Sequence, residues 1–410
     1  MQPARLVPLQ ADETGEARRP LLLLLGAVGL VLLLSGCAGE GKAPQTTLKP
    51  KGPQAETINH LINPVFMVAG VVFVAILGGA LFVALKFRAK DDDDFDEFPD
   101  QVHGNFKLEI GWTILPAVVL LIVGIFSVAA IFNLAQKPKE DAIHVEVYGQ
   151  QWWWEYRYDI NGDGDYTDII TANDLVIPAG RQVSLKIKSR DVIHSWWAPA
   201  LNGKKDAVPG RTHPLTIQAD APGEYIGQCT EFCGLSHAEM RIKVVALDAD
   251  GFTSWVDHQE SGFQAPTDEA AVAGWTTFAS QCTSCHRLTG MTEPTDPSKV
   301  FEYPEVVNQV SGEAPNLLHL MSRTTFAGAK FNLRKDTPEC VALGQDWAQT
   351  DDGLKTCLNR NALEAWLRNP PAEKAMHPGD TPSPESRGMP NFNLTEAQID
   401  DLVAFLTGLK

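Results

Sequence analysis

Three uncharged apolar runs stand out in the first third of the chain. Residues 21–36 follow Arg18 and Arg19 and form the shortest run, whereas residues 65–85 and 113–135 continue for 21 and 23 residues without a charge. At a rise of about 1.5 Å per residue, each longer run can cross roughly 30 Å of hydrocarbon. The short run behind two arginines is typical of a secretory signal peptide. The pattern therefore predicts an exported chain with a two-helix transmembrane hairpin.

Basic residues directly after the first long run indicate the orientation of this hairpin. Lys86, Arg88 and Lys90 lie in the short segment that joins the two runs. Positively charged loops stay in the cytoplasm, and the acidic run at residues 91–94 counts little toward orientation. We therefore expect both ends of the hairpin outside the cytoplasm, with everything after about residue 139 on the periplasmic or extracellular side of a bacterial cell membrane.

The signal-like run ends in the order Leu34, Ser35, Gly36, Cys37. This order resembles the lipobox of bacterial lipoproteins, in which the cysteine is diacylated and becomes the new N-terminus. A signal peptide that happens to end beside a cysteine is the alternative. We expect a lipoprotein-type signal peptide over residues 1–36, lipidation at Cys37, an N-terminal linker over residues 37–62 and the hairpin over residues 63–138.

Beyond the hairpin the pattern changes first to β-type and then to helical segments. Short stretches rich in Val, Ile and aromatic residues, separated by Gly, Pro, Asn and Asp, cover residues 143–148, 152–158, 182–187, 215–217 and 241–247. A Gly-, Pro- and Ser-bearing stretch follows at residues 259–267. Near the end of the chain, Thr395 and Gln398 predict a capping box, and one face of the helix after it would be formed by Ile399, Leu402, Val403 and Leu406. The predicted fold is multidomain, with an all-β sandwich over residues 139–258, a linker over 259–270 and an all-α domain over 271–410.

Composition narrows the class of protein and partner. With 44% hydrophobic and 21% charged residues among 410, the chain is neither wholly disordered nor a polytopic membrane bundle. A net charge of −17 argues against nucleic acid as a partner and favours a basic one. Almost all of this acidity lies after residue 139, so a basic donor could be steered to the external domains.

The most informative motif is a set of soft metal ligands between residues 228 and 240. Cys229, Cys233, His237 and Met240 offer two thiolates, an imidazole and a thioether, a set that selects copper over hard ions. Two thiolates four residues apart can bridge two copper ions, and His194 is the candidate for a second imidazole. A Cys229–Cys233 disulfide and a structural zinc site are the alternatives, but a disulfide explains neither His237 nor Met240, and zinc seldom takes methionine.

Several separated motifs resemble, in the same order, those of subunit II of cytochrome c oxidase. They are EIGWTILPA at 109–117, GQQWWWEY at 149–156, DVIHSW at 191–196, DAVPGR at 206–211 and the C-x-E-x-C-x-x-x-H-x-x-M run that begins at Cys229. The resemblance covers residues from about 60 to 258. It implies a cupredoxin sandwich carrying the dinuclear copper centre known as CuA. The implied ligands are His194, Cys229, Cys233, His237, Met240 and the backbone carbonyl of Glu231.

The same resemblance implies three further roles. The side chain of Glu231 would also touch a magnesium site shared with subunit I. Trp152 would be the electron-entry tryptophan, with its ring at the surface close to copper, and simple packing is the alternative. Glu109 would be the acid at the mouth of a proton path, with an ordinary interfacial carboxylate as the alternative.

Cys282, Cys285 and His286 form a C-x-x-C-H motif, which attaches c-type haem through two thioether bonds and a proximal imidazole. A redox C-x-x-C pair or half of a zinc site would not require the histidine. Met389 lies in a segment that resembles the G-M-P-x-F loop of cytochromes c and is the expected sixth ligand, with Met376 as runner-up. We therefore expect residues 271–410 to form a cytochrome c domain with one covalent haem c.

Two smaller patterns remain. Cys340 and Cys357 are the cysteines left after the lipid, copper and haem assignments, and an external compartment permits a disulfide between them. Residues 159–168 match the D-x-N-x-D-G start of a calcium-binding loop, but position twelve is Ile170 instead of glutamate. A polar hairpin loop is the favoured interpretation of that segment, and calcium is the alternative.

Together these motifs predict subunit II of a haem-copper terminal oxidase, a proton-translocating oxidoreductase, with a fused cytochrome c. Electrons would pass from an external cytochrome or a quinol–cytochrome reductase to haem c, to CuA and on to subunit I, where dioxygen is reduced. The input subunit of a nitric oxide reductase and a free membrane-anchored electron carrier are the alternatives. A quinol oxidase subunit is disfavoured, because such relatives lack the copper ligands found in this chain.

Overall fold

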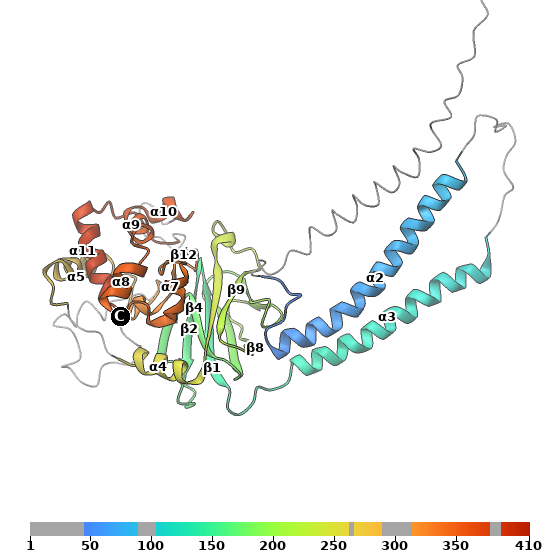
Figure 1. Ribbon diagram of the computed structural model, residues 1–410, viewed down its shortest axis with the longest axis horizontal. Coiled ribbons are helices and arrows are strands. Elements are labelled where there is room, and N and C mark those ends of the chain that lie inside the picture. The colour runs from blue at the N-terminus through green and yellow to red at the C-terminus, as the bar shows by residue number, and fades with distance from the viewer. Residues whose placement is uncertain (1–44, 89–103, 262–265, 289–313, 378–386) are drawn as a thin grey trace, which may run out of the picture. The chain divides into compact units, whose positions relative to one another are not determined.

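A computed structural model describes residues 45–88, 104–261, 266–288, 314–377 and 387–410, which are coloured in Figure 1. The described residues all belong to one structural unit. The predicted signal peptide and the lipidation of Cys37 lie outside the described residues and stay predictions.

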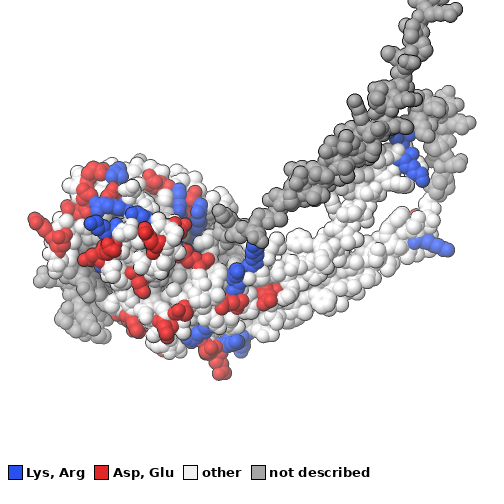
Figure 2. All heavy atoms as spheres, in the orientation of Figure 1, with Lys and Arg blue, Asp and Glu red and all other residues white. Residues whose placement is uncertain are grey.

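Two long apolar helices precede the β domain and lie side by side (Figure 1). They are α2 (Pro53–Lys86) and α3 (Phe106–Leu134). Both are long and apolar enough to cross a membrane, and their most apolar stretches have no residue buried within the described chain. On the face shown in Figure 2, charged residues lie near the ends of the helices and the surface between them is uncharged. The structure therefore confirms two apolar helices that suit a membrane anchor.

The first helix begins ten residues earlier than the predicted hairpin, so the predicted linker over residues 37–62 is partly helical. Pro53 occupies the first helical position, where its missing N–H removes no helical hydrogen bond. Directly before it, the backbone of Lys51 donates to the carbonyl of Ala200 (2.7 Å) and accepts from the N–H of Asp220 (2.8 Å). These two bonds fix the start of α2 against the β domain.

Residues 143–247 form two five-stranded sheets with the orders β3-β2-β1-β5-β8 and β4-β10-β9-β6-β7. The strands are β1 (Ile143–Gln150), β2 (Trp153–Asp159), β3 (Ile169–Ala172), β4 (Asp174–Pro178), β5 (Val183–Ser189), β6 (His194–Trp197), β7 (Lys205–Ala207), β8 (His213–Ile217), β9 (Gly223–Cys229) and β10 (Arg241–Leu247). The predicted all-β sandwich is confirmed. The sequence patterns identified β1, β2, β5, β8 and β10 but missed the other five strands.

One core lies in this sandwich, and alternation along the strands builds it. Val145, Val147, Leu185 and Ile187 occupy every second position of β1 and β5 and are fully buried. Burying each such side chain contributes about 1.5–3 kcal/mol. The same core includes Cys229, Cys233 and Met240, so the soft ligands lie in an apolar interior.

The C-terminal region is helical, as predicted, with one small β hairpin. The helix α4 (Ala249–Gln259) still belongs to the sandwich, because Phe252 and Trp255 pack in its core, so residues 139–258 are not purely β as predicted. The elements of the C-terminal region are α5 (Glu269–Gln281), η4 (Leu320–Ser322), β11 (Thr325–Phe326), β12 (Phe331–Asn332), α7 (Pro338–Ala342), η5 (Gly344–Asp346), α8 (Asp351–Cys357), α9 (Arg360–Arg368), α10 (Pro370–Glu373) and α11 (Glu396–Thr407). The helix α11 starts with the predicted capping box of Thr395 and Gln398. It packs on α5 at Gly274, where a Cβ atom would lie 2.0 Å from the carbonyl oxygen of Asp401. A glycine is required for this close approach.

The C-terminal domain packs directly on the sandwich beside β4. Asp174 is 1% exposed and accepts hydrogen bonds from the N–H (2.7 Å) and hydroxyl (2.6 Å) of Thr324 and from the hydroxyl of Thr325. Its neighbour Asn173 has a left-handed φ of 70° and accepts from the N–H of Gly328 at 3.1 Å. Because a buried carboxylate is costly without donors, these bonds specify where the domain docks.

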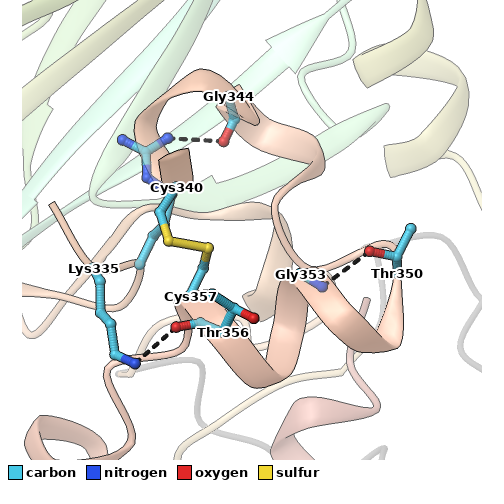
Figure 3. Close-up of a disulfide and its surroundings, with 8 residues drawn as sticks. Lys335, Cys340, Gly344, Thr350, Gly353, Thr356 and Cys357 are labelled. Carbon is cyan, nitrogen blue, oxygen red and sulfur yellow. Dashed lines mark hydrogen bonds between the residues drawn. A yellow bond between two sulfur atoms is a disulfide. The ribbon is translucent and has the colours of Figure 1, made fainter. Parts of the chain in front are cut away.

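Cys340 and Cys357 are joined by a disulfide between α7 and the end of α8 (Figure 3). Both residues are buried, and their Cα atoms are 5.5 Å apart. Beside the bridge, the Nζ atom of Lys335 donates to the carbonyl of Thr356 at 2.7 Å.

Removing this disulfide should destabilise the C-terminal domain. A Cys340→Ala/Cys357→Ala double variant is expected to lose about 3 kcal/mol of unfolding free energy, because the unfolded chain is no longer constrained. Denaturant unfolding followed by tryptophan fluorescence measures this, since Trp347 is fully buried in the same segment. A reducing agent should destabilise the parent chain and leave the double variant unchanged. Free thiols at both positions in non-reducing mass mapping would contradict the assignment.

Candidate metal centre

Neighbouring strands and the turn between them deliver the soft ligands to one place. His194 begins β6, Cys229 ends β9, and the turn after β9 carries Cys233 and His237 before Met240 leads into β10. The strands β6 and β9 are antiparallel partners, with Trp196 opposite Cys229. This pairing brings a histidine that is 35 residues away in sequence next to the first cysteine.

All six predicted ligand groups gather around the two sulfur atoms. The Sγ atom of Cys229 lies 3.9 Å from Nδ1 of His194 and 3.3 Å from the carbonyl oxygen of Glu231. The Sγ atom of Cys233 lies 3.5 Å from Nδ1 of His237 and 3.8 Å from Sδ of Met240. The two Sγ atoms are 3.8 Å apart, too far for a disulfide bond of about 2.05 Å. The donor set fits soft metal ions held between two bridging thiolates.

A carboxylate and a glycine fix the ring of His194. Asp191 Oδ1 lies 2.8 Å from His194 Nε2, so Nδ1 is directed at the thiols. Although burial disfavours the charged ring, the hydrogen bonds with Asp191 and Cys229 raise the pKa of His194 above its usual value. Gly149 makes room for the ring, because a Cβ atom there would lie 2.9 Å from its Cδ2 atom.

The two thiols titrate as a pair. A hydrogen bond with Cys233 lowers the pKa of Cys229 to about 4, against the opposing effect of burial. The same neighbour, together with burial, raises the pKa of Cys233 far above its usual value. A metal that binds both sulfurs as thiolates must therefore displace a proton.

Trp152 contacts this centre but is not at the surface. Its ring is buried, and its Nε1 atom donates to the carbonyl of Cys233 at 2.9 Å. The C-terminal domain covers its backbone, since Lys374 Nζ donates to the Trp152 carbonyl at 2.7 Å. The expectation of a surface ring is therefore wrong, while the electron-entry role of Trp152 stays a prediction.

The C-x-x-C-H motif lies where α5 ends. Cys282 is buried and Cys285 is exposed, and they do not form a disulfide. The Nδ1–H group of His286 donates a hydrogen bond to the carbonyl oxygen of Pro315 at 2.8 Å, which leaves Nε2 as the free ligand atom. Burial lowers the pKa of His286, which favours this neutral form.

Arg323 is a functional candidate for which no motif predicted a role. It is 2% exposed, and within the described residues its Nε and Nη1 atoms have no hydrogen-bond partner. Burial lowers the pKa of its guanidinium to about 10, and a buried, half-satisfied cation is costly. Its remaining N–H groups therefore fit an anionic group that binds in this domain. The sequence signal that could have found it is the run SRTTF at residues 322–326.

The two candidate methionines belong to different cores. Met389 is half-buried and packs against the core of the C-terminal domain. Met376 packs instead against the core of the sandwich.

The other predicted site residues do not belong to a group of metal ligands within the described part of the chain. Glu109 is exposed in the first turn of α3. In the loop at residues 159–168, Asp159 accepts from the N–H groups of Gly162 and Gly164, and Asp168 accepts from that of Ile160. Among the described residues, the only group of three or more histidine, cysteine and acidic ligands is His194, Cys229 and Cys233. The polar hairpin interpretation therefore suits residues 159–168, and a magnesium site at Glu231 stays a prediction.

Comparisons with known proteins agree with this geometry. The family models for the transmembrane and the periplasmic domain of cytochrome c oxidase subunit II match residues 47–130 and 159–247. Cytochrome c oxidase subunit 2 of Alkalihalophilus pseudofirmus is 30% identical over 388 residues, which cover 93% of this chain and 95% of the relative. The corresponding subunit of Bacillus subtilis is 29% identical over 408 residues, which cover 95% and 97%.

Among solved structures, the periplasmic domain of subunit II of the cytochrome oxidase of Bradyrhizobium japonicum is 30% identical, with a TM-score of 0.28. The match covers 30% of this chain and 97% of that domain. Because the Alkalihalophilus pseudofirmus subunit is 30% identical and matched along nearly its whole length, the chain belongs to the cytochrome c oxidase subunit II family, and this membership implies CuA copper.

Proposed function

We propose that this chain is the electron-input subunit of a terminal haem-copper oxidase, in which residues 271–410 are a c-type cytochrome domain that passes electrons to CuA. The observation that carries the proposal is the gathering of six copper-ligand groups at Cys229 and Cys233, beside a packed domain that presents the C-x-x-C-H motif.

The residues around the copper ligands suit electron transfer. Copper bound between two thiolates supplies a delocalised pair that accepts one electron with little change in geometry. The sulfur atoms of Cys229, Cys233 and Met240 are nearly fully buried, which keeps water away from them. Asp191 holds the His194 ring in one orientation. A rigid, dry ligand shell of this kind reduces the structural rearrangement that accompanies the transfer of each electron.

The C-terminal domain has the parts that a covalent haem requires. Haem bound to Cys282 and Cys285 would supply a one-electron carrier whose potential depends on its axial ligands. The proximal nitrogen would be Nε2 of His286. The unpartnered N–H groups of Arg323 fit the carboxylate groups of a porphyrin. Met389 packs against the core of this domain, whereas Met376 packs against the sandwich, and this difference favours Met389 as the sixth ligand.

An exposed apolar surface beside the copper ligands supports an oxidase partner over a free electron carrier. Val192 and Ile193 precede His194 and are 37% and 45% exposed, while Phe232 and Leu235 flank Cys233 and are 77% and 54% exposed. Exposed apolar residues that cluster at a functional site indicate a protein interface. We assign this surface as the contact with the oxidase subunit that receives the electrons and reduces dioxygen while protons are translocated.

The acidic external domains would steer a basic electron donor.

Replacing one bridging sulfur should stop electron transfer after the haem. A Cys229→Ser variant of the assembled complex is expected to lose the near-infrared and paramagnetic signals of CuA, because an alcohol does not replace a bridging thiolate. Its haem c should remain reducible by an external donor, while oxygen consumption falls to the background rate. The neighbouring substitution Thr230→Ser, outside the ligand set, is the control and should behave as the parent. Normal turnover by Cys229→Ser would refute the proposed function.

The two candidate axial methionines can be distinguished by substitution. Met389→Leu is expected to abolish the charge-transfer band of thioether-ligated haem and to lower its reduction potential, because the thioether raises that potential. Met376→Leu should keep both properties, since Met376 packs against the sandwich core. Visible spectroscopy and redox titration measure the difference. Loss of the band in Met376→Leu alone would reverse the assignment.

A further inference from the structure

The segment immediately before Met389 is connected by hydrogen bonds through Gln151 to the turn after β9 that carries Cys233. Arg387 Nε donates to Gln151 Oε1 at 3.0 Å, and Gln151 Nε2 donates to the carbonyl oxygen of Cys233 at 2.7 Å. Arg387 and Gln151 are 236 residues apart in sequence. One amide side chain therefore connects the C-terminal domain with a bridging copper ligand.

The C-terminal side of this connection is held in place. The N–H of Arg387 donates to the carbonyl of His377 at 2.6 Å. Gly388 has a φ of 94°, a left-handed conformation that favours glycine, and a Cβ atom there would lie 2.3 Å from Sδ of Met376. The chain from Arg387 to Met389 thus passes closely over Met376, in a conformation that a larger residue at position 388 would disturb.

The copper side is held as firmly. The backbone N–H of Gln151 donates to Oδ2 of Asp191 at 2.8 Å, and Asp191 orients the copper ligand His194. A Cβ atom on Gly234 would lie 2.9 Å from Nε2 of Gln151, so glycine at this position lets the amide reach the carbonyl of Cys233. Gln151 is therefore hydrogen-bonded both to the proposed copper ligand Cys233 and to Asp191, which holds the ring of His194.

We infer that Arg387 and Gln151 carry the electron from the cytochrome domain to CuA, by a route that bypasses the indole ring of Trp152. From Met389 the route follows the backbone to Arg387, crosses one hydrogen bond to Gln151 and a second one to Cys233. Electron tunnelling weakens less across bonds and hydrogen bonds than across open contacts. The cytochrome domain loses one electron, the copper centre gains one, and no bond is made or broken.

Within the described residues, the contacts of Trp152 do not lead as directly to Met389. Its ring also donates to the carbonyl of Cys233, at 2.9 Å, but its backbone carbonyl contacts the C-terminal domain through Lys374. Lys374 is fifteen residues before Met389, whereas Arg387 is two residues before it. The inference rests on the proposed function, because it takes Met389 as a haem ligand and the copper centre as the acceptor.

The test is the rate at which CuA is reduced after rapid photoreduction of haem c in the assembled complex. Gln151→Leu and Arg387→Met each remove a hydrogen bond of the route and should slow this step several-fold. Gln151→Glu keeps an acceptor for Arg387 but cannot donate to Cys233, so it should also be slow. Trp152→Phe should remain close to the parent rate. Arg368→Met, which removes a surface arginine paired with Glu396, is the matched control and should have no effect.

Three measurements other than turnover distinguish the loss of the electron-transfer route from a general disturbance of the protein structure. The paramagnetic spectrum of CuA, the reduction potential of the haem and the hydrogen-exchange protection of residues 387–392 should be unchanged in Arg387→Met, which leaves every copper ligand in place. Parent rates in Arg387→Met and Gln151→Leu, or a slow step confined to Trp152→Phe, would overturn the inference. Parent protein in which reduced haem never reduces CuA would instead refute the proposed function.

Discussion

The pairing of β6 with β9 is the constraint on which the copper centre depends. The N–H of Thr230 donates to the carbonyl of Ser195 at 3.0 Å, and that of Cys229 donates to the carbonyl of Met240 at 2.9 Å. These backbone bonds fix Cys229 between the strand that carries His194 and the residue that supplies the thioether. Because side chains alternate across a sheet, a register shift of one residue would turn His194 away from the sulfur atoms.

A second set of contacts makes the fused domain a fixed neighbour of this centre. Asp174 binds Thr324 and Thr325 in a buried site, and Lys374 donates to the carbonyls of Trp152 and Ala327. Lys374 is buried, and this burial lowers the pKa of its ammonium group to about 7. Polar groups that are costly to bury unless they are paired specify one docked arrangement. A docked donor keeps a constant distance to its acceptor, whereas a freely tethered one would have to find it for each electron.

The sequence was most informative where the function is encoded locally. Cys229, Cys233, His237 and Met240 lie within twelve residues, and the capping box of α11 spans only four, so both could be recognised from spacing. The strands β6 and β9 were missed although they carry ligands, because short strands that alternate with polar and glycine residues give little periodic signal. The burial of Trp152 and the contact between Gln151 and Arg387 depend on how two domains pack, which no local pattern contains.

Two histidines at the proposed redox centres, His194 and His286, are fixed through opposite ring nitrogens, and their hydrogen-bond partners differ in charge. His194 has its Nε2 atom at Asp191, and its Nδ1 atom faces the thiols. His286 has its Nδ1 atom at the neutral carbonyl of Pro315, which leaves Nε2 free. A carboxylate partner increases the electron density that an imidazole can offer a metal, whereas a carbonyl only sets the tautomer and the ring orientation. With copper bound, His194 would therefore be the more strongly donating of these two imidazoles, and a thioether from Met389 would raise the potential of a bound haem toward that of its acceptor.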